Sequence, residues 1–164
     1  MNNDLLNRPN VRRVADALAV TGSASQIIAL SDTARTAEDA AASLNCELGA
    51  IVKSLVFRID LQPVMVLIAG DRRCDIKMLA AAFGNPGKAE RADADLVQSA
   101  TGYSIGGVSP IGHSTRLPMV IDQSLERFEV IYAAAGHPYC VFGTTLDELC
   151  RLTDAKVHAS VTEC

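Results

Sequence analysis

Two neighbouring apolar segments constrain the fold of this chain most strongly. Residues 51–59 and 64–69 are rich in Ile, Val, Leu and Phe, and the tetrapeptide Asp60-Leu61-Gln62-Pro63 separates them. Runs of this length, with Pro at the entry of the second, are typical of two antiparallel strands joined by a short connection. Each run is far shorter than the roughly 20 apolar residues that cross a bilayer. The two segments therefore predict a β-hairpin in a globular fold.

Helix and strand signals surround this hairpin without a strict β-α-β rhythm. Helices are predicted at residues 10–20, 38–45, 75–83, 93–100 and 146–152, and further strands at 26–30, 119–121, 129–133 and 140–142. Thr36, followed by two acidic residues, is a typical helix N-cap. At 164 residues with no repeat or linker, the chain fits one compact domain, residues 1–164. We expect an α+β fold with a central, largely antiparallel or mixed sheet surrounded by helices.

Charge and cysteine usage argue against several classes of protein. The net charge of −4 disfavours a protein that coats nucleic acid, and no DNA partner is expected. Three groups could still form local basic patches: Arg12 with Arg13, Arg72 and Arg73 with Lys77, and Lys88 with Arg91. The five cysteines form no C-x-x-C pair and have no His at ligand spacing. We therefore expect reduced thiols, no metal and no cofactor. The N-terminal residues contain no apolar signal core, so a cytoplasmic protein without membrane segments is expected.

Lys53 interrupts the apolar pattern of the first hairpin strand. Because side chains alternate along a strand, Lys53 shares a face with Leu55 and Phe57, whereas Ser54 and Val56 face the other way. A lone ammonium on the more apolar face is costly unless it has a partner or lies beside a cleft. Two interpretations stay open: the amine extends to the edge of the sheet, or it lines a pocket and faces a phosphate or a carbonyl oxygen.

Residues 101–112, Thr-Gly-Tyr-Ser-Ile-Gly-Gly-Val-Ser-Pro-Ile-Gly, contain four glycines and one proline. This composition predicts a loop with unusual backbone angles. Such a loop can be purely structural, or it can present backbone N–H groups to an anion or an oxyanion. The segment matches neither a lipase-type nucleophile elbow nor a nucleotide-binding glycine motif.

His137 follows a predicted strand in the sequence Ala-Gly-His-Pro. It can orient a substrate or a water molecule, and an ordinary loop histidine is an equally good interpretation. No motif arranges Ser, His and Asp as a catalytic triad, so a hydrolase of that type is not indicated.

Six segments together resemble the YbaK-like aminoacyl-tRNA deacylases, a family that includes the editing insertion domain of bacterial prolyl-tRNA synthetase. The resemblance runs from about residue 12 to residue 153. Its carriers are residues 36–41, 49–57, 70–75, 101–112, 117–122 and 135–137. Each segment is weakly specific alone, and their common order and spacing make the resemblance strong.

The resemblance implies which residues act. Lys53 matches the lysine on which editing depends, Gly106 and Pro110 match a G-x-x-x-P loop, and His137 matches the Gly-His of the insertion domain. On this basis Lys53, Gly106 and His137 are predicted to be catalytic. The residues predicted to bind substrate are Gly107, Ser109, Pro110, Thr36 and Tyr103.

The implied reaction is hydrolysis of the ester between a wrong amino acid and tRNA. An ordered water, assisted by the vicinal ribose hydroxyl, attacks the ester, so no protein nucleophile is required. At residues 136–139 the chain has Gly-His-Pro-Tyr, whereas the cysteine-specific YbaK branch resembles Gly-Lys-Arg-Gly at this place. This difference favours alanine over cysteine as the amino acid mischarged on tRNA(Pro). The expected partners are mischarged aminoacyl-tRNA and, as a candidate, prolyl-tRNA synthetase. The alternatives are a catalytically idle tRNA- or synthetase-binding module of the same fold, and an unrelated small-molecule hydrolase.

Overall fold

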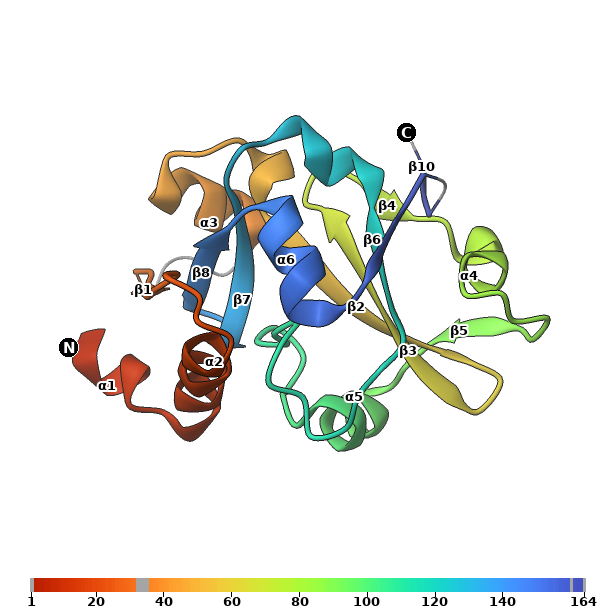
Figure 1. Cartoon of the computed structure of the whole chain (residues 1–164), viewed down its shortest axis with the longest axis horizontal. Coiled ribbons are helices and arrows are strands. Elements are labelled where there is room, and N and C mark those ends of the chain that lie inside the picture. The colour runs from red at the N-terminus through yellow and green to blue at the C-terminus, as the bar shows by residue number, and fades with distance from the viewer. Residues whose placement is uncertain (1, 32–35, 160, 164) are drawn as a thin grey trace.

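A five-stranded mixed sheet forms the centre of the computed structural model, which describes residues 2–31, 36–159 and 161–163 (Figure 1). Its strands lie in the order β5-β2-β3-β6-β9. Their bounds are β5 (Ala89–Arg91), β2 (Val52–Ile59), β3 (Gln62–Ala69), β6 (Met119–Asp122) and β9 (Lys156–His158). Strand β2 pairs antiparallel with β3 and β5, whereas β3, β6 and β9 run parallel to one another. The predicted hairpin is therefore confirmed as the antiparallel half of this sheet.

Two smaller sheets complete the strand structure. The first is antiparallel in the order β1-β8-β7, with bounds β1 (Ile27–Ala29), β8 (Cys140–Thr144) and β7 (Ile131–His137). The second pairs β10 (Thr162–Glu163) with β4 (Arg73–Cys74). An isolated bridge between Ile51 and Tyr132 connects the start of β2 to β7. The large sheet and the β1-β8-β7 sheet thus meet at the beginning of β2.

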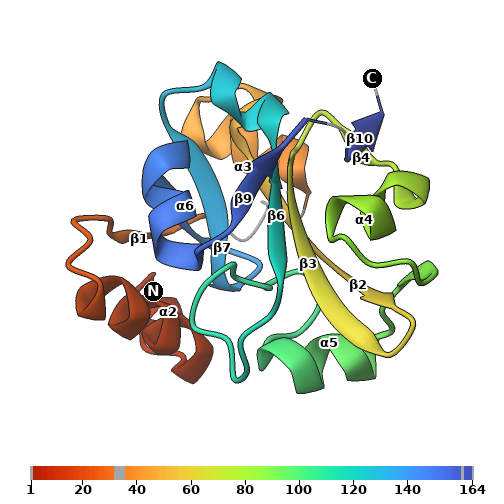
Figure 2. The ribbon, with the colours of Figure 1, turned by 45° about the vertical axis from the view of Figure 1, so that its right-hand side comes forward.

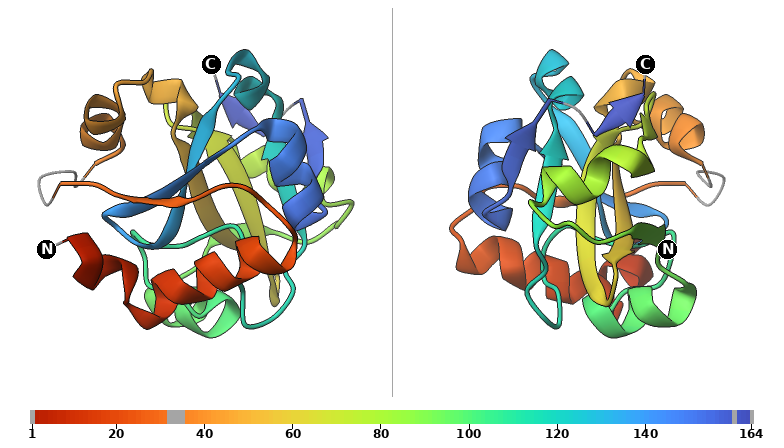
Figure 3. Two further views of the ribbon diagram at one scale, coloured as in Figure 1. Left: turned by 60° about the vertical axis from the view of Figure 1, so that its left-hand side comes forward. Right: turned by 90° about the vertical axis from the view of Figure 1, so that its right-hand side faces the viewer.

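Helices cover both faces of the large sheet. They are α1 (Asn2–Leu6), α2 (Pro9–Val20), α3 (Ala37–Leu44), α4 (Ile76–Ala82), α5 (Ala94–Thr101) and α6 (Leu146–Thr153), with short 3₁₀ turns η1 (Leu48–Ala50) and η2 (Gln123–Arg127). Figure 2 shows β9, β6, β3 and β2 side by side, with α4 on one side and α6 on the other. In both views of Figure 3, α2 and α5 lie at the same end of the molecule.

Two clusters of buried side chains pack on the two faces of the hairpin. On one face Phe57 and Ile68 pack with Leu79 of α4. On the other face Val52 and Val56 join the main core. The main core also receives residues of α2, α5, α6, β7 and β8, among them Val14, Val97, Leu149, Ala133 and Phe142. Because both faces of β2 are packed, apolar residues occur on both faces of this strand, and Lys53, Ser54 and Arg58 are its polar exceptions.

Side-chain caps fix where several helices begin. Thr36 caps α3 by accepting a hydrogen bond from Asp39 N at 3.1 Å, as predicted. Asp75, Asp93 and Thr145 cap α4, α5 and α6 in the same way. Each cap satisfies a backbone N–H that the first turn of a helix leaves without a partner.

The predicted helices and longer strands are confirmed, with small shifts at their ends. Strand β7 starts two residues later than predicted and continues to His137. The continuation was missed because a β-bulge between Ala134 and His137 breaks the alternation that marks a strand. Helix α1 and strands β4, β5, β9 and β10 were not predicted. These strands have only two or three residues and carry polar side chains, so no periodic pattern marks them.

The described residues also bear on the metal and membrane predictions. No helix among them is long and apolar enough to cross a membrane. They contain no group of three or more His, Cys, Asp or Glu side chains placed to hold a metal ion. Four cysteines are free thiols, and Cys164 lies outside the described residues.

Candidate active site

A cavity of about 390 Å³ opens along the part of β2 that has no second neighbouring strand. Strand β5 pairs only with residues 57–59 of β2, so the edge of residues 52–56 remains available to line a cavity. The opposite wall is the glycine-rich segment at residues 105–108, and the N-terminal turn of α3 and the β7–β8 hairpin close the ends. The lining residues are Thr36, Ala37, Ala40, Ile51, Val52, Lys53, Ser54, Leu55, Val56, Arg91, Ala92, Val97, Ile105, Gly106, Val108, Tyr132, Ala134, Pro138 and Val141.

Lys53 provides the cationic group of the strand wall. It is half-buried, and its Nζ donates a hydrogen bond to the carbonyl oxygen of Arg72 at 2.5 Å. Desolvation by burial lowers the pKa of Lys53, and the charges of Glu38 and Asp71 oppose that shift. An ammonium has three N–H donors, and Arg72 accepts one of them. Lys53 can therefore donate to a carbonyl oxygen or a phosphate that enters the cavity.

Ser54 lines the same cavity from the other face of β2. Its neighbours on that face, Val52 and Val56, are buried in the main core. The Ser54 Oγ is buried and has no hydrogen-bond partner in the described part of the chain. Apart from this hydroxyl, the lining beside it is aliphatic, so the interior suits a small side chain.

The glycine loop forms the opposite wall through its backbone. Gly106 lines the cavity with φ of +98°, a conformation that L side chains rarely adopt. Gly107 lies behind it, where a Cβ atom would come within 3.0 Å of the backbone N and Cα of His137. Glycine at both positions therefore lets the loop approach β7 and turn toward the cavity.

Two predicted substrate-binding residues instead hold the loop from inside. Tyr103 is completely buried, and its hydroxyl donates to the carbonyl oxygens of Ile111 and Gly112 at 2.8 and 3.2 Å. Ser109 is also completely buried, and its Oγ accepts from Ile111 N. Pro110 lines a separate hollow on the other side of the loop. Direct substrate contact by these three residues stays a prediction, and their observed contacts are those of loop support.

His137 lies at the end of β7 and is not among the residues that line the cavity. Its Nδ1 accepts a hydrogen bond from Tyr139 N at 3.1 Å, and its ring lies 5.4 Å from that of Tyr139. Burial, and then the charge of Arg8, lower the pKa of His137. The lowered pKa favours the neutral imidazole, and the backbone of His137 packs against Gly107. Its catalytic role stays a prediction.

The structure thus brings Thr36, Lys53 and Gly106 together around one cavity, although they are far apart in sequence. It also adds Arg91 and Tyr132, which were not predicted as site residues. Arg91 belonged to a candidate basic patch, but its strand β5 is too short to be recognised from the sequence. Tyr132 carried no distinguishing signal, because it is an ordinary aromatic residue within a strand.

The four cysteines in the described part of the chain do not supply a nucleophile to this site. Burial raises the pKa values of Cys46, Cys140 and Cys150, and it raises that of Cys74 to about 11. A thiol with a raised pKa is protonated and weakly nucleophilic near neutral pH. None of these four residues lines the cavity.

Comparisons with known proteins agree with this geometry. The sequence profile of the aminoacyl-tRNA editing domain matches residues 31–152. The "Putative Cys-tRNA(Pro)/Cys-tRNA(Cys) deacylase EbsC" of Enterococcus faecalis is 36% identical over 102 residues, which are 62% of each chain. The proline–tRNA ligase of a Geobacter species is 35% identical over 92 residues, 56% of this chain but 16% of the ligase. The crystal structure of "a putative trans-editing enzyme for prolyl tRNA synthetase" is 36% identical, with a TM-score of 0.90 over 96% of this chain and 99% of that one.

The fold and the cavity first define a class: a compact α+β protein with a small cavity between a cationic strand and a glycine loop. The profile match over most of the chain narrows that class, and the chain belongs to the aminoacyl-tRNA editing domain family. The resemblance inferred from the six sequence segments is thereby confirmed.

Proposed function

We propose that this protein is an aminoacyl-tRNA deacylase that hydrolyses a small amino acid mischarged on tRNA(Pro), with alanine preferred over cysteine. The observation that carries the proposal is the position of the Lys53 ammonium, on the wall of a small aliphatic cavity that also contains Gly106. Residues 1–164 act as one editing domain in the cytoplasm.

Each wall of the cavity contacts a different part of the aminoacyl ester. Lys53 donates a hydrogen bond to the ester carbonyl or to the terminal phosphate, and backbone N–H groups near Gly106 support the terminal adenosine or the oxyanion. The aliphatic interior accepts the amino-acid side chain. A water molecule, assisted by the vicinal ribose hydroxyl, attacks the carbonyl carbon, and the tRNA hydroxyl leaves. Positioning suffices because an ester is already labile.

Relatives support tRNA(Pro) as the nucleic acid. The Enterococcus faecalis relative is named for Cys-tRNA(Pro) and Cys-tRNA(Cys), and the solved trans-editing structure is named for prolyl-tRNA synthetase. Similarity to proline–tRNA ligases makes prolyl-tRNA synthetase a candidate partner as well. The same Enterococcus relative favours cysteine as a second candidate amino acid, whereas Gly136-His-Pro-Tyr139 in this chain favours alanine.

The proposal is tested by measuring deacylation of Ala-, Ser-, Cys- and Pro-charged tRNA(Pro) side by side at near-neutral pH. Alanine is expected to be released fastest and proline to be spared. Because one methyl group in an apolar pocket contributes about 1–3 kcal/mol to discrimination, selectivity among the small residues will be incomplete. Strong preference for Cys would move the protein to the cysteine-specific branch. No release from any of the four would favour a catalytically idle binding module.

A further inference from the structure

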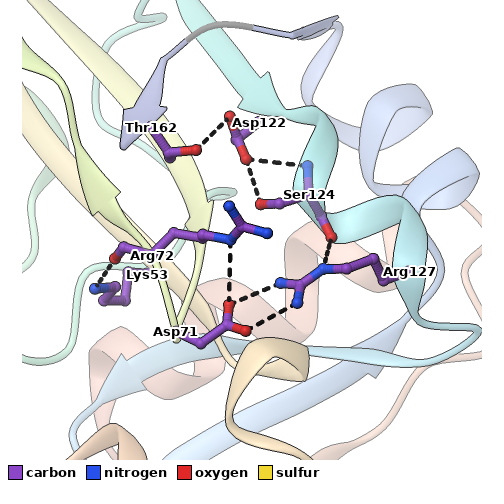
Figure 4. A network of polar contacts seen from close by, with 7 residues as sticks. All are labelled: Lys53, Asp71, Arg72, Asp122, Ser124, Arg127 and Thr162. Carbon is purple, nitrogen blue, oxygen red and sulfur yellow. Dashed lines mark hydrogen bonds and ion pairs between the residues drawn. The ribbon is translucent and has the colours of Figure 1, made fainter. Parts of the chain in front are cut away.

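A bidentate ion pair between Asp71 and Arg127 belongs to the same network of polar contacts as Lys53, the cationic residue of the strand wall (Figure 4). Arg127 of η2 donates from Nη1 and Nη2 to the two carboxylate oxygens of Asp71, at 2.8 and 2.7 Å. Its Nε donates to the carbonyl oxygen of Ser124 at 2.7 Å. Every nitrogen of the guanidinium therefore has an acceptor. A planar fork used in this way fixes the direction of the carboxylate as well as its distance.

Close packing holds the Arg127 guanidinium in place. It lies 4.8 Å from the centroid of the Phe128 ring. On the side of η1, a Cβ atom on Gly49 would come within 2.6 Å of the Phe128 ring and 2.9 Å of Arg127 Nη2, so only glycine permits this approach. The guanidinium is thus confined between an aromatic ring and a backbone turn.

The ion pair is connected to Lys53 through the backbone of Arg72. Asp71 precedes Arg72, whose carbonyl oxygen accepts the hydrogen bond from Lys53 Nζ at 2.5 Å. The same turn is closed by a hydrogen bond from Arg72 N to Ala69 O at 3.0 Å. The carboxylate of Asp71 therefore anchors, from outside the cavity, the peptide that holds the Lys53 ammonium at the cavity wall.

We propose that Asp71 and Arg127 are positioning residues for the reaction: their ion pair fixes the turn whose Arg72 carbonyl aligns Lys53 toward the substrate. This inference rests on the proposed deacylase function. Neither residue lines the cavity, so both act through Lys53 and not on the substrate.

A second ion pair in the molecule provides a matched contrast. Arg116 and Asp154 approach to 2.7 Å, but their side chains are 79% and 82% exposed and lie far along the chain from Lys53. The Arg127 and Asp71 side chains are 38% and 34% exposed. Exposed pairs contribute little because water screens them, and only the more buried pair is joined to a cavity residue.

Charged groups on four elements face Lys53. Desolvation by burial is the largest influence on the pKa of Lys53 and lowers it. Glu38 of α3 and Asp71 of the turn raise this pKa, and Arg73 of β4 and Arg91 of β5 lower it. Removing the negative charge of Asp71 should therefore lower the pKa of Lys53 further. If the turn became looser while Asp71 kept its charge, the pKa of Lys53 would rise instead, because a more solvated lysine regains its ordinary, higher pKa.

The decisive variant is Asp71→Asn, with Asp154→Asn as its matched control. Asparagine tolerates the positive φ of residue 154, so the control should fold normally. Lys53 is titrated in the free protein by following its ¹³Cε resonance, which is assigned by its absence in Lys53→Arg. The pKa of Lys53 is expected to fall in Asp71→Asn and to stay at the wild-type value in Asp154→Asn.

Deacylation of alanyl-tRNA(Pro) gives the second readout. In Asp71→Asn, kcat is expected to fall about tenfold with KM nearly unchanged, because a displaced ammonium affects the transition state more than binding. Arg127→Lys keeps the positive charge but loses the fork, so it should reproduce the loss in kcat without lowering the pKa of Lys53. Asp154→Asn should match the wild type in both constants.

A folded Asp71→Asn protein with wild-type Lys53 titration and wild-type kcat would overturn the inference. If Asp71→Asn does not fold, wild-type kcat in folded Arg127→Lys overturns it equally. Should the wild type release no amino acid at all, the proposed function fails. In that case the titration of Lys53 in Arg127→Lys still decides whether the ion pair positions Lys53: this variant keeps the charge of Asp71, so a loosened turn should raise the pKa of Lys53, and a wild-type value would overturn the inference.

Discussion

The two walls of the cavity contribute to the site in different ways. On β2, a regular strand presents one charged side chain, Lys53, whose position depends on contacts with residues elsewhere in the fold. On the opposite wall, the segment around Gly106 presents backbone, and its side chains serve to hold the loop in shape. The strand wall thus contributes a charged side chain, and the loop wall contributes backbone groups held in a fixed conformation.

This difference predicts how each wall responds to substitution. A side-chain function is removed by truncating the side chain, with little effect on folding. A backbone function is removed by adding a side chain where glycine is required, and it is insensitive to most changes at neighbouring loop positions. Each variant below is therefore paired with a control of the same chemical kind outside the cavity.

The largest effect is expected for Lys53→Ala. Loss of a charge-assisted donor to the ester should reduce single-turnover deacylation of alanyl-tRNA(Pro) about 10²- to 10³-fold. The melting temperature should stay unchanged or rise, because burial lowers the pKa of Lys53, which means that keeping this amine protonated costs the folded state free energy relative to the unfolded state. Lys88→Ala is the control, since the Lys88 side chain is 83% exposed and outside the cavity. Near-wild-type turnover in folded Lys53→Ala would contradict the role of the strand wall.

A smaller loss is expected for Gly106→Val. The branched side chain strains a residue at φ of +98° and displaces the loop backbone from the cavity, so activity should fall about tenfold. Gly84→Val is the control, because Gly84 also has a positive φ of +64° and open space around it. Chemical denaturation should show a lower free energy of unfolding for both variants. Among the folded proteins, only Gly106→Val should have reduced deacylase activity. Equal activity of the two folded variants would show that the loop wall is structural only.

The smallest effect is expected for Ser54→Ala, and it concerns stability. The buried Ser54 hydroxyl has no partner among the described residues, so its removal should raise the free energy of unfolding by about 1 kcal/mol. Ser99→Ala is a suitable control, because Ser99 is exposed and its Oγ donates to Leu96 O. Urea unfolding of both variants checks this expectation. A loss of stability in Ser54→Ala would show that the hydroxyl already has a partner in the free protein.

The sequence predicted the parts of this molecule that depend on local patterns. The hairpin, the main helices and the Thr36 cap follow from apolar runs and from side chains that bond to nearby backbone groups. Lys53 stood out because a cation is anomalous within an apolar strand. Gly106 stood out because several glycines lie close together.

The remaining features depend on contacts between distant residues. The cavity exists because β5 covers only the last residues of β2, and no local signal marks where strand pairing stops. Arg127 meets Asp71 across 56 residues of sequence, so its role could not be inferred from its neighbours. Arg91 reaches the cavity from a strand of three residues that is formed by its pairing with β2.

A double-mutant cycle between Lys53→Ala and Gly106→Val tests the central claim most directly, since that claim is that both walls act on one ester. Single-turnover hydrolysis of alanyl-tRNA(Pro) is measured for the wild type, each single variant and the double variant. Groups that act as a unit on one transition state show strongly non-additive losses. We therefore expect the double variant to be about as slow as Lys53→Ala alone. Losses that multiply, as for independent sites, would contradict a shared ester between the two walls.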